Sequence, residues 1–351
     1  MTHIVELPRR VVVGHDVLGD IAAICKDLGI EQHTLSYSEG EALVLSGPTT
    51  KKYASPILDS IRSRLEIVKE ASKSEVERLM EVNDVTMVIS VGGGKVIDVG
   101  KLLAFEKEIP FISVPTAPSH DGIVSERVTL RGNDNKKHSL KGSPPIAVVA
   151  DLSIIKEAPY RLIASGAADA MSKYTSIYDW KLARAKGEYY SEYSASLSLL
   201  AADIVRNSAD MIKEREERGL KNLINALVSS GIAMSIAGSS SPASGSEHLF
   251  SHALDEIAQH RSLEGNLHGN QCGVGSILAS YLQGQDWKWV RDALKSVGAP
   301  TTASELGFSD DVVLEALLKA PTIRKRHTIL TEKPLTREIA QKACETTGVT
   351  V

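Results

Sequence analysis

Short apolar runs rich in valine and isoleucine alternate with helical patterns in the first part of the chain. Four such runs predict strands, at Glu41–Gly47, Val85–Val91, Pro110–Val114 and Ile146–Ala150. Each run is apolar at consecutive positions, which is typical of strands buried on both faces of a parallel sheet. Between the first two runs, Tyr53–Ala71 shows a helical pattern with scattered charge. The alternation predicts an open α/β domain.

The pattern changes after Tyr160. Arg127–His138, with Gly-Asn-Asp-Asn at its centre, still predicts a β-hairpin. Beyond it, long amphipathic segments predict helices at Leu162–Ala185, Tyr189–Lys213, Leu220–Ala237, Ser246–Gln259 and Gly273–Leu282. Glycine and proline separate these segments, and no convincing strand pattern occurs among them. We therefore expect a doubly wound, Rossmann-like α/β domain over residues 1–155 and an all-helical domain over residues 156–351.

Composition narrows the class of protein. The 351 residues fit two domains, and 42% hydrophobic with 24% charged residues is typical of a soluble globular chain. A net charge of -4 argues against a nucleic-acid or anionic-membrane partner. The three cysteines are far apart, so no disulfide framework or Cys-x-x-Cys motif is present. The first residues lack the apolar core of a signal peptide, and no run approaches the roughly 20 apolar residues of a membrane helix. We expect a cytoplasmic protein.

Two loops after predicted strands could hold a phosphate. Gly92, Gly93 and Gly94 follow an apolar strand and open a helix, so backbone N–H groups and the helix N-terminus favour an anion there. Lys95 follows the glycines directly, which matches neither the G-x-G-x-x-G fingerprint nor a Walker loop. The Pro115–Gly122 loop follows the next strand, at the edge where open α/β sheets bind ligands. The alternative is that both loops are plain structural turns.

Histidines in the helical part indicate a metal site. His248 and His252 are four residues apart, so on a helix they share one face. His268 and an acid among small residues, Asp169, are further candidates. One aspartate and two histidines suit Zn²⁺ or Fe²⁺, and three protein ligands leave positions for water or substrate. The alternative is that the histidines are surface or hydrogen-bonded core residues and that the aspartate is a helix cap.

Together these segments resemble a superfamily that groups glycerol dehydrogenase, iron-dependent alcohol dehydrogenases and 3-dehydroquinate synthase. The shared order is a GGG-K-x-x-D loop, a Pro-Thr loop, an Asp-Ala helix and two histidine segments, here at Gly92–Asp98, Pro115–Ser119, Asp169–Ala170, His248 and His268–Gly269. Within this superfamily the chain is most similar to the glycerol-1-phosphate dehydrogenases of archaeal type, through the strings Pro115–Ser125, Ser244–Leu254 and His268–Gly273.

The resemblance implies a dehydroquinate synthase-like fold with a cleft between its two domains. It implies a metal ion, zinc or ferrous iron, held by Asp169, His248 and His268. His252 and Asp121 then become catalytic residues that contact the substrate, as does Asp169. The implied contacts to NAD or NADP are Gly92, Gly93, Gly94, Lys95, Asp98, Thr116, Ser119 and Ser125.

The activity that the resemblance implies is reduction of dihydroxyacetone phosphate to sn-glycerol 1-phosphate, the glycerol backbone of archaeal-type ether lipids. His252 or a water would carry the proton and Asp121 would orient hydroxyls. NAD-specific enzymes usually have an acid after the strand that meets the adenosine ribose. Here Ser46–Lys52 contains no acid and ends in two lysines, so we expect NADP to work as well as NAD, unless those lysines are only solvated.

Three rival functions stay open. They are a glycerol or other small-polyol dehydrogenase, a lyase of the dehydroquinate synthase kind, and a binding protein without turnover. The substrate phosphate has several candidate partners, Lys137, Lys141, Arg324, Lys325 and Arg326. We expect a phosphorylated small-molecule substrate, no nucleic-acid partner, no membrane insertion and a homo-oligomer.

Overall fold

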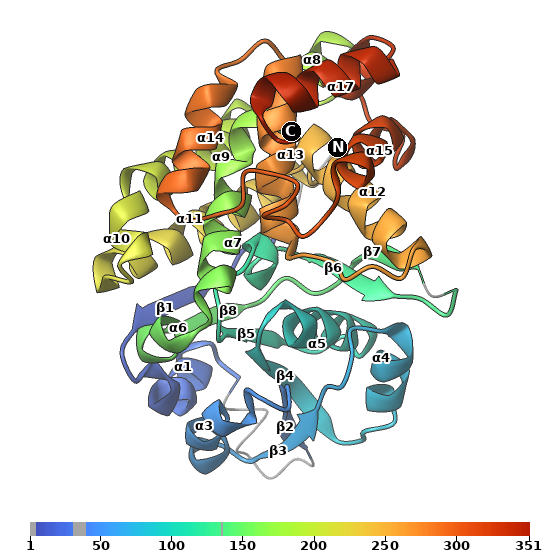
Figure 1. The fold of residues 1–351 in the computed structure, drawn as a ribbon. Coiled ribbons are helices and arrows are strands. Elements are labelled where there is room, and N and C mark those ends of the chain that lie inside the picture. The colour runs from blue at the N-terminus through green and yellow to red at the C-terminus, as the bar shows by residue number, and fades with distance from the viewer. Residues whose placement is uncertain (1–4, 31–39, 135) are drawn as a thin grey trace. The chain divides into compact units, whose positions relative to one another are not determined.

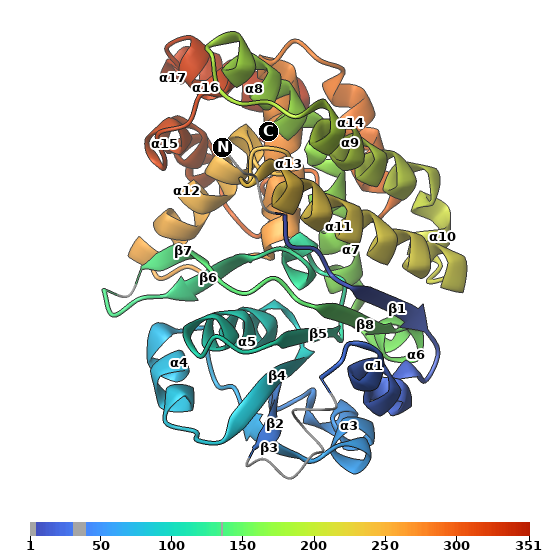
Figure 2. The same cartoon turned by 180° about the vertical axis from the view of Figure 1, so that it is seen from behind.

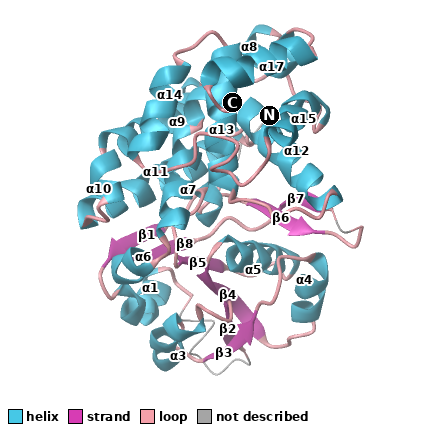
Figure 3. Ribbon diagram, viewed as in Figure 1, coloured by secondary structure: helices cyan, strands magenta, loops and turns pink. Residues whose placement is uncertain are grey.

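The computed structural model describes residues 5–30, 40–134 and 136–351. The chain divides into two compact units, Met1–Pro159 (unit 1) and Tyr160–Val351 (unit 2) (Figure 1). Unit 1 combines a parallel sheet with helices. Residues 160–351 are all described, and their regular elements are all helices, as the colours of Figure 3 show. The predicted fold class, an α/β unit followed by a helical one, is confirmed.

The sheet of unit 1 has six strands in the order β1-β8-β5-β4-β2-β3, and every neighbouring pair is parallel. The strands are β1 (Arg10–Gly14), β2 (Glu41–Ser46), β3 (Ser63–Ile67), β4 (Val85–Gly92), β5 (Phe111–Pro115) and β8 (Ala147–Asp151). The four predicted strands are β2, β4, β5 and β8, which form the interior of the sheet. Their consecutive apolar residues are buried because helices cover both faces.

The predicted helix over Tyr53–Ala71 is wrong beyond its first turns. Short helices η2 (Lys51–Tyr53) and α3 (Ser55–Ser60) end where Ile61 adopts an extended backbone, and β3 follows. The physical reason is that β3 is an edge strand, paired only with β2 and half-buried at all five positions. Its alternation of polar and apolar residues therefore resembles the mixed surface of a helix. The opposite edge strand, β1, was also missed.

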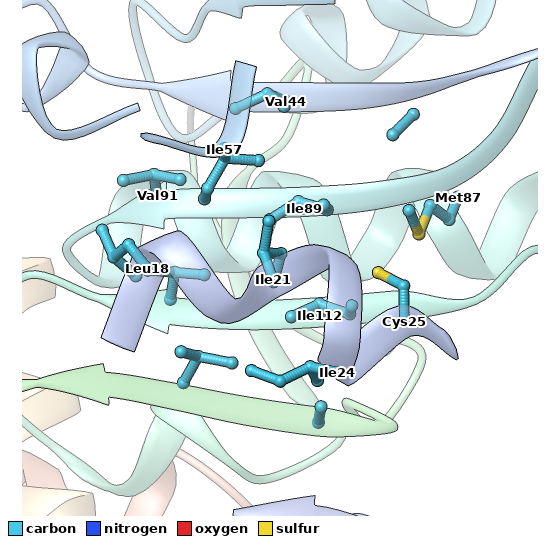
Figure 4. Packing of buried hydrophobic residues seen from close by; sticks show 14 of the residues in the cluster. Leu18, Ile21, Ile24, Cys25, Val44, Ile57, Met87, Ile89, Val91 and Ile112 are labelled. Atoms are coloured by element: carbon cyan, nitrogen blue, oxygen red, sulfur yellow. The ribbon is translucent and has the colours of Figure 1, made fainter. Parts of the chain in front are cut away.

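Apolar side chains fill the space between one face of the sheet and helices α1 (Ile21–Asp27) and α3. Ile21 and Ile57 are fully buried there and belong to one cluster with Val44, Ile89 and Ile112 of the strands (Figure 4). The opposite face carries α5 (Gly94–Glu106). A Cβ atom added at Gly100 would lie 2.0 Å from the Ser90 hydroxyl of β4, so this helix packs directly on the sheet.

A hairpin and two helices also belong to unit 1. Strands β6 (Arg127–Arg131) and β7 (Lys137–Lys141) pair antiparallel and confirm the predicted hairpin, whose turn includes residue 135 outside the described residues. Helices α4 (Lys73–Met80) and α6 (Leu152–Glu157) follow β3 and β8. Seen from behind in Figure 2, β6 runs along α5.

Unit 2 is built from helices, namely α7 (Tyr160–Met171), α8 (Lys173–Ala185), α9 (Glu192–Asn207), α10 (Ala209–Lys213), α11 (Glu217–Ala237), α12 (Ser246–His260), α13 (His268–Leu282), α14 (Trp287–Ser296), α15 (Asp310–Lys319), α16 (Ile329–Glu332) and α17 (Arg337–Thr347). The predicted helix Leu162–Ala185 is divided at Ser172. The hydroxyl of this serine donates to the Asp169 carbonyl and so competes with the backbone hydrogen bonds of the helix. The remaining predicted helices correspond to α9 to α13, with a break at Ser208 and with α13 beginning at His268 and not at Gly273.

One described helix, α11, is long and apolar enough to cross a membrane by length and composition alone. This corrects the prediction that no run approaches that length. The run was missed because alanine, glycine and serine interrupt its larger apolar residues. Most of α11 is buried inside unit 2, where it packs against α9 and α7. Its burial is that of a core helix.

Candidate functional site

The glycine loop and the Pro-Thr loop of unit 1 lie side by side. Gly92 ends β4 and is paired in register with Pro115, which ends β5. A Cβ atom at Gly94 would lie 2.3 Å from His120 Nε2, so the second loop packs closely against the start of α5. At Gly93, the N-cap of α5, a Cβ would meet nothing within 4 Å, and no N-cap side chain bonds to the first turn. An open, uncapped helix N-terminus of this kind fits a pyrophosphate.

The predicted cofactor residues occupy two environments. Thr116 and Ser119 are buried in the Pro-Thr loop, and Lys95 is exposed on the first turn of α5. Asp98, by contrast, is engaged inside unit 1. Its Oδ2 accepts a hydrogen bond of 3.0 Å from the Thr129 N–H, and its Oδ1 lies 2.8 Å from Lys101 Nζ.

Lys101 is a fully buried cation that the sequence analysis missed. Its Nζ donates to the carbonyl oxygens of Gly122, at 2.9 Å, and Ser125, at 3.3 Å, and also to that of Arg127. The chain segment that carries the predicted substrate residue Asp121 is therefore tied to α5. Because a buried ammonium needs a partner, the Asp98 carboxylate and these carbonyls together make the arrangement stable.

Replacing Lys101 with methionine should lower the free energy of unfolding by about 3–5 kcal/mol, because it leaves the buried Asp98 carboxylate without its cation. Urea unfolding of the full chain measures this change. Lys107→Met is a matched control, since Lys107 at the end of α5 donates to the carbonyls of Met80 and Val82 and has no carboxylate in that contact. It should cost about 1 kcal/mol. Equal losses in the two variants would contradict the role assigned to Lys101.

Unit 2 brings the three predicted metal ligands together. Asp169 comes from α7, His248 from α12 and His268 from the first turn of α13, which packs against both other helices (Figure 1). One oxygen or nitrogen from each of them, and the sulfur of Cys272, all lie within 4.8 Å of one another. Asp169, His248 and Cys272 are buried and His268 is half-buried. These four residues are called the metal cluster below.

The two histidines of the cluster are held through their Nδ1 atoms. His248 Nδ1 lies 2.8 Å from the Glu247 carboxylate and therefore donates to it. Ser251 gives its only proton to Gln271 Oε1, so at 3.1 Å it accepts from His268 Nδ1. Each Nε2 then keeps its lone pair for a cation, and His248 Nε2 lies 3.8 Å from Asp169 Oδ1. Metal-binding histidines are typically held in this way.

The charge of Asp169 also fits a cation. Burial alone would raise the pKa of this carboxyl, but Lys173, His248 and His268 more than offset that effect and hold the pKa well below its usual range. Lys173 Nζ lies 2.9 Å from Asp169 Oδ1 and is itself fully buried. The carboxylate is therefore ionised and positioned for a ligand role. The donor set of one carboxylate and two imidazoles fits Zn²⁺ or Fe²⁺.

His252 lies beside the metal cluster, and its ring centroid is 6.0 Å from that of His268. Its Nε2 is 3.1 Å from Nη2 of Arg324. Two residues further on, Arg326 donates to the Ser244 carbonyl and to the hydroxyls of Ser244 and Ser240. Arg324, one of the five predicted phosphate partners, is thus in contact with a predicted site residue.

Sequence reasoning missed Cys272 and Lys173. A signal was available for both, because each stands four residues after a cluster member on a helix, in His268-x-x-x-Cys272 and Asp169-x-x-x-Lys173. Asp121, Lys137 and Lys141 belong to unit 1, where Asp121 opens a short 3-10 turn and the two lysines are exposed on β7. Their predicted roles toward the substrate stay predictions.

Comparison with known proteins agrees with this geometry. The family model of iron-containing alcohol dehydrogenases matches residues 12–159. Two relatives named glycerol-1-phosphate dehydrogenase (NAD(P)+) are similar over nearly the whole chain. The one from Thermococcus kodakarensis is 48% identical, covering 99% of this chain and 98% of its own, and the one from Methanosarcina mazei is 47% identical, covering 98% and 96%.

Solved structures agree on the fold. A probable glycerol dehydrogenase from Sinorhizobium meliloti has a TM-score of 0.80 at 21% identity, covering 99% of this chain and 98% of its own. Glycerol dehydrogenase from Schizosaccharomyces pombe has a TM-score of 0.78 at 21% identity, covering 100% and 94%. The resemblance seen in the sequence is thereby confirmed, and the chain belongs to the glycerol-1-phosphate dehydrogenase family.

Proposed function

We propose that this protein is an NAD(P)-dependent oxidoreductase that reduces dihydroxyacetone phosphate to sn-glycerol 1-phosphate. The names of relatives 45–48% identical to the chain support the activity. The observation that carries the proposal is the position of Arg324 beside His252 and the metal cluster. A guanidinium at this place suits a phosphorylated substrate, whereas free glycerol offers it no anion.

Residues 156–351 are assigned the metal and the substrate, and residues 1–155 the dinucleotide. Asp169, His248 and His268 would hold a zinc or ferrous ion. Such an ion supplies Lewis-acid chemistry, because it polarises a carbonyl and stabilises negative charge on its oxygen. The chain itself contributes preorganisation. Lys173 fixes the Asp169 carboxylate, and Glu247 and Ser251 fix the tautomers of the two histidines.

Arg324 is assigned the substrate phosphate. A guanidinium has five N–H donors and no acceptor, so it matches phosphate oxygens in pairs. Arg326 already donates to the serine-rich segment before α12, to the hydroxyls of Ser244 and Ser240. Lys325, Lys137 and Lys141 are exposed and remain weaker candidates.

His252 is assigned the proton transfer. Because Arg324 can only donate, His252 Nε2 accepts in the present arrangement, and the imidazole carries its proton on Nδ1. Contact of Arg324 with a phosphate would release Nε2 for the substrate. Asp121, which opens the 3-10 turn of unit 1, is assigned the orientation of the substrate hydroxyls.

NADPH should be used about as well as NADH. The loop after β2 contains no acid, and its Lys51 and Lys52 are exposed. The turn is held by a hydrogen bond of 3.0 Å from the Gly47 N–H to Thr50 Oγ1. No carboxylate of this loop would therefore repel a 2′-phosphate. We expect kcat/KM values within about tenfold of each other, a difference below about 1.4 kcal/mol. A double replacement of both lysines by glutamate should lower kcat/KM for NADPH alone. Strong preference of the unchanged protein for NADH would contradict this prediction.

The test of the function is oxidation of NADH and NADPH with dihydroxyacetone phosphate, before and after chelation and zinc repletion, with a chiral assay of the product. Zinc-restored formation of sn-glycerol 1-phosphate supports the proposal. Oxidation of free glycerol without that activity would favour a polyol dehydrogenase. Unchanged NADH absorbance together with loss of a carboxylate substrate would favour a lyase.

The setting of the reaction is proposed on the same basis. We assign the protein to the cytoplasm as a homo-oligomer whose product supplies the backbone of ether-type phospholipids. Tyr193 and Leu200 of α9 are exposed apolar side chains, as is Tyr189 just before it, and they suit a contact between copies.

A further inference from the structure

Cys272 is the member of the metal cluster that has no role in the function proposed above. We propose that the Cys272 sulfur is a fourth ligand of the metal in the resting enzyme. This inference rests on the proposed function, because it concerns the same metal. It adds a thiolate to a set that otherwise consists of one carboxylate and two imidazoles.

The position of Cys272 on α13 is the first observation. It stands one helical turn after His268, and pairs of residues four apart on a helix present their side chains on one face. Its Sγ lies 3.6 Å from His268 Nε2 and 3.9 Å from His268 Nδ1. The sulfur is also within 4.8 Å of the ligand atoms of Asp169 and His248. Small side-chain adjustments bring four such atoms to metal–ligand distances of about 2.0–2.3 Å.

Close packing of α13 on α7 is the second observation. A Cβ atom at Gly269 would lie 1.9 Å from the Ser165 carbonyl oxygen, and one at Gly273 would lie 3.1 Å from the Ala168 Cβ. These glycines follow His268 and Cys272 directly in the chain. They allow the helix to approach α7 closely, and that approach brings the thiol near Asp169. The glycines therefore place the sulfur as well as the imidazole.

The other cysteines of the chain provide a contrast. Cys25 lies among aliphatic side chains of the unit 1 core, including Leu18, Ile21 and Ile24. There a thiol acts as a small apolar group. Cys272 is equally buried, but two imidazoles and a carboxylate surround its sulfur. A buried site that is rich in ligand atoms is the environment of a metal-binding thiol.

A sulfur ligand would have two chemical consequences, for the thiol proton and for the choice of metal. When Sγ binds the cation, the thiol proton leaves to solvent and no other bond changes. An O/N/N/S donor set would favour zinc and cobalt over magnesium or manganese. The sulfur would thus retain the metal between turnovers.

Cobalt substitution of the full chain tests this inference. Replacement of the native metal with Co²⁺ should give a thiolate-to-cobalt charge-transfer band in the near ultraviolet. The band should vanish in Cys272→Ser and persist in Cys344→Ser, a control with a buried cysteine near the end of α17. Zinc affinity, measured by competition with a chelator, should fall about 10–100-fold in Cys272→Ser, the range seen when groups that support a metal site are lost.

Several results would overturn the proposal. One is the absence of the charge-transfer band in the unchanged cobalt protein, which needs no variant to fold. Another is a band that survives in Cys272→Ser or Cys272→Ala. Turnover of dihydroxyacetone phosphate by a protein without the band would remove this inference and leave the proposed function intact. A clear band in a protein that does not turn over this substrate would support the sulfur ligand and contradict the proposed function.

Discussion

Replacing His268 with alanine is expected to remove the bound metal and almost all activity. His268 supplies one of the two imidazoles of the cluster, and its Nδ1 is held by Ser251 so that Nε2 faces the ligand atoms of Asp169 and His248. Loss of the cation removes several kcal/mol of charge stabilisation on the substrate oxygen. A loss of about 4 kcal/mol corresponds to a fall in kcat of roughly a thousandfold.

Metal content and kcat have to be measured together for this variant. His260→Ala is the matched control, because His260 is exposed at the end of α12, outside the metal cluster. The control should keep one metal per chain and full turnover. Full activity with stoichiometric metal in His268→Ala would refute the ligand assignment. Circular dichroism of both variants checks that the helices of unit 2 are retained.

Replacing Arg324 with methionine should weaken use of the phosphorylated substrate by about 100-fold in kcat/KM. The estimate follows from the loss of hydrogen bonds to a charged group, which contribute about 1.5–3 kcal/mol. The change should appear mainly in KM, because the phosphate is remote from the reacting carbonyl. Turnover of unphosphorylated dihydroxyacetone should stay nearly constant, since that substrate has no anion for Arg324 to bind.

Lys325→Met is the control for the arginine variant. Lys325 is the exposed neighbour of Arg324 and carries the same charge, so this variant separates local contact from a general loss of positive charge. The control should leave KM for dihydroxyacetone phosphate unchanged. If both variants raise KM equally, the effect is long-range attraction. If only unphosphorylated substrate is affected in Arg324→Met, the phosphate assignment is wrong.

The interior of the sheet could be predicted because burial on both faces leaves a simple pattern. Glu41–Ser46 and Val85–Gly92 are nearly continuous aliphatic runs, which few other structures produce. The edge strand Ser63–Ile67 has one neighbour and half-buried positions, so its residues do not all need to be apolar. Such a strand resembles a helix in sequence, and only pairing with β2 decides its structure.

The metal residues could be predicted for a different reason. Asp169, His248 and His268 are chemically conspicuous and occur in a family order. The residues that contact these ligands and His252 are harder to recognise in the sequence. Lys173 resembles any helix lysine until the burial of its ammonium is known, and the contact of Arg324 with His252 joins residues 72 positions apart. Contacts of that separation depend on how helices pack, and hydrophobic periodicity does not encode them.

The metal cluster joins α7 to α12 and α13, two consecutive helices that follow much later in the chain. An ion held there is therefore a cross-link as well as a reactant. Its ligands come together only in the folded unit, so the ion binds the folded state of unit 2 in preference to the unfolded state. Each tenfold excess of free metal over its dissociation constant adds about 1.4 kcal/mol to the stability of unit 2. Loss of the metal would thus lower the stability of unit 2 as well as the catalytic activity.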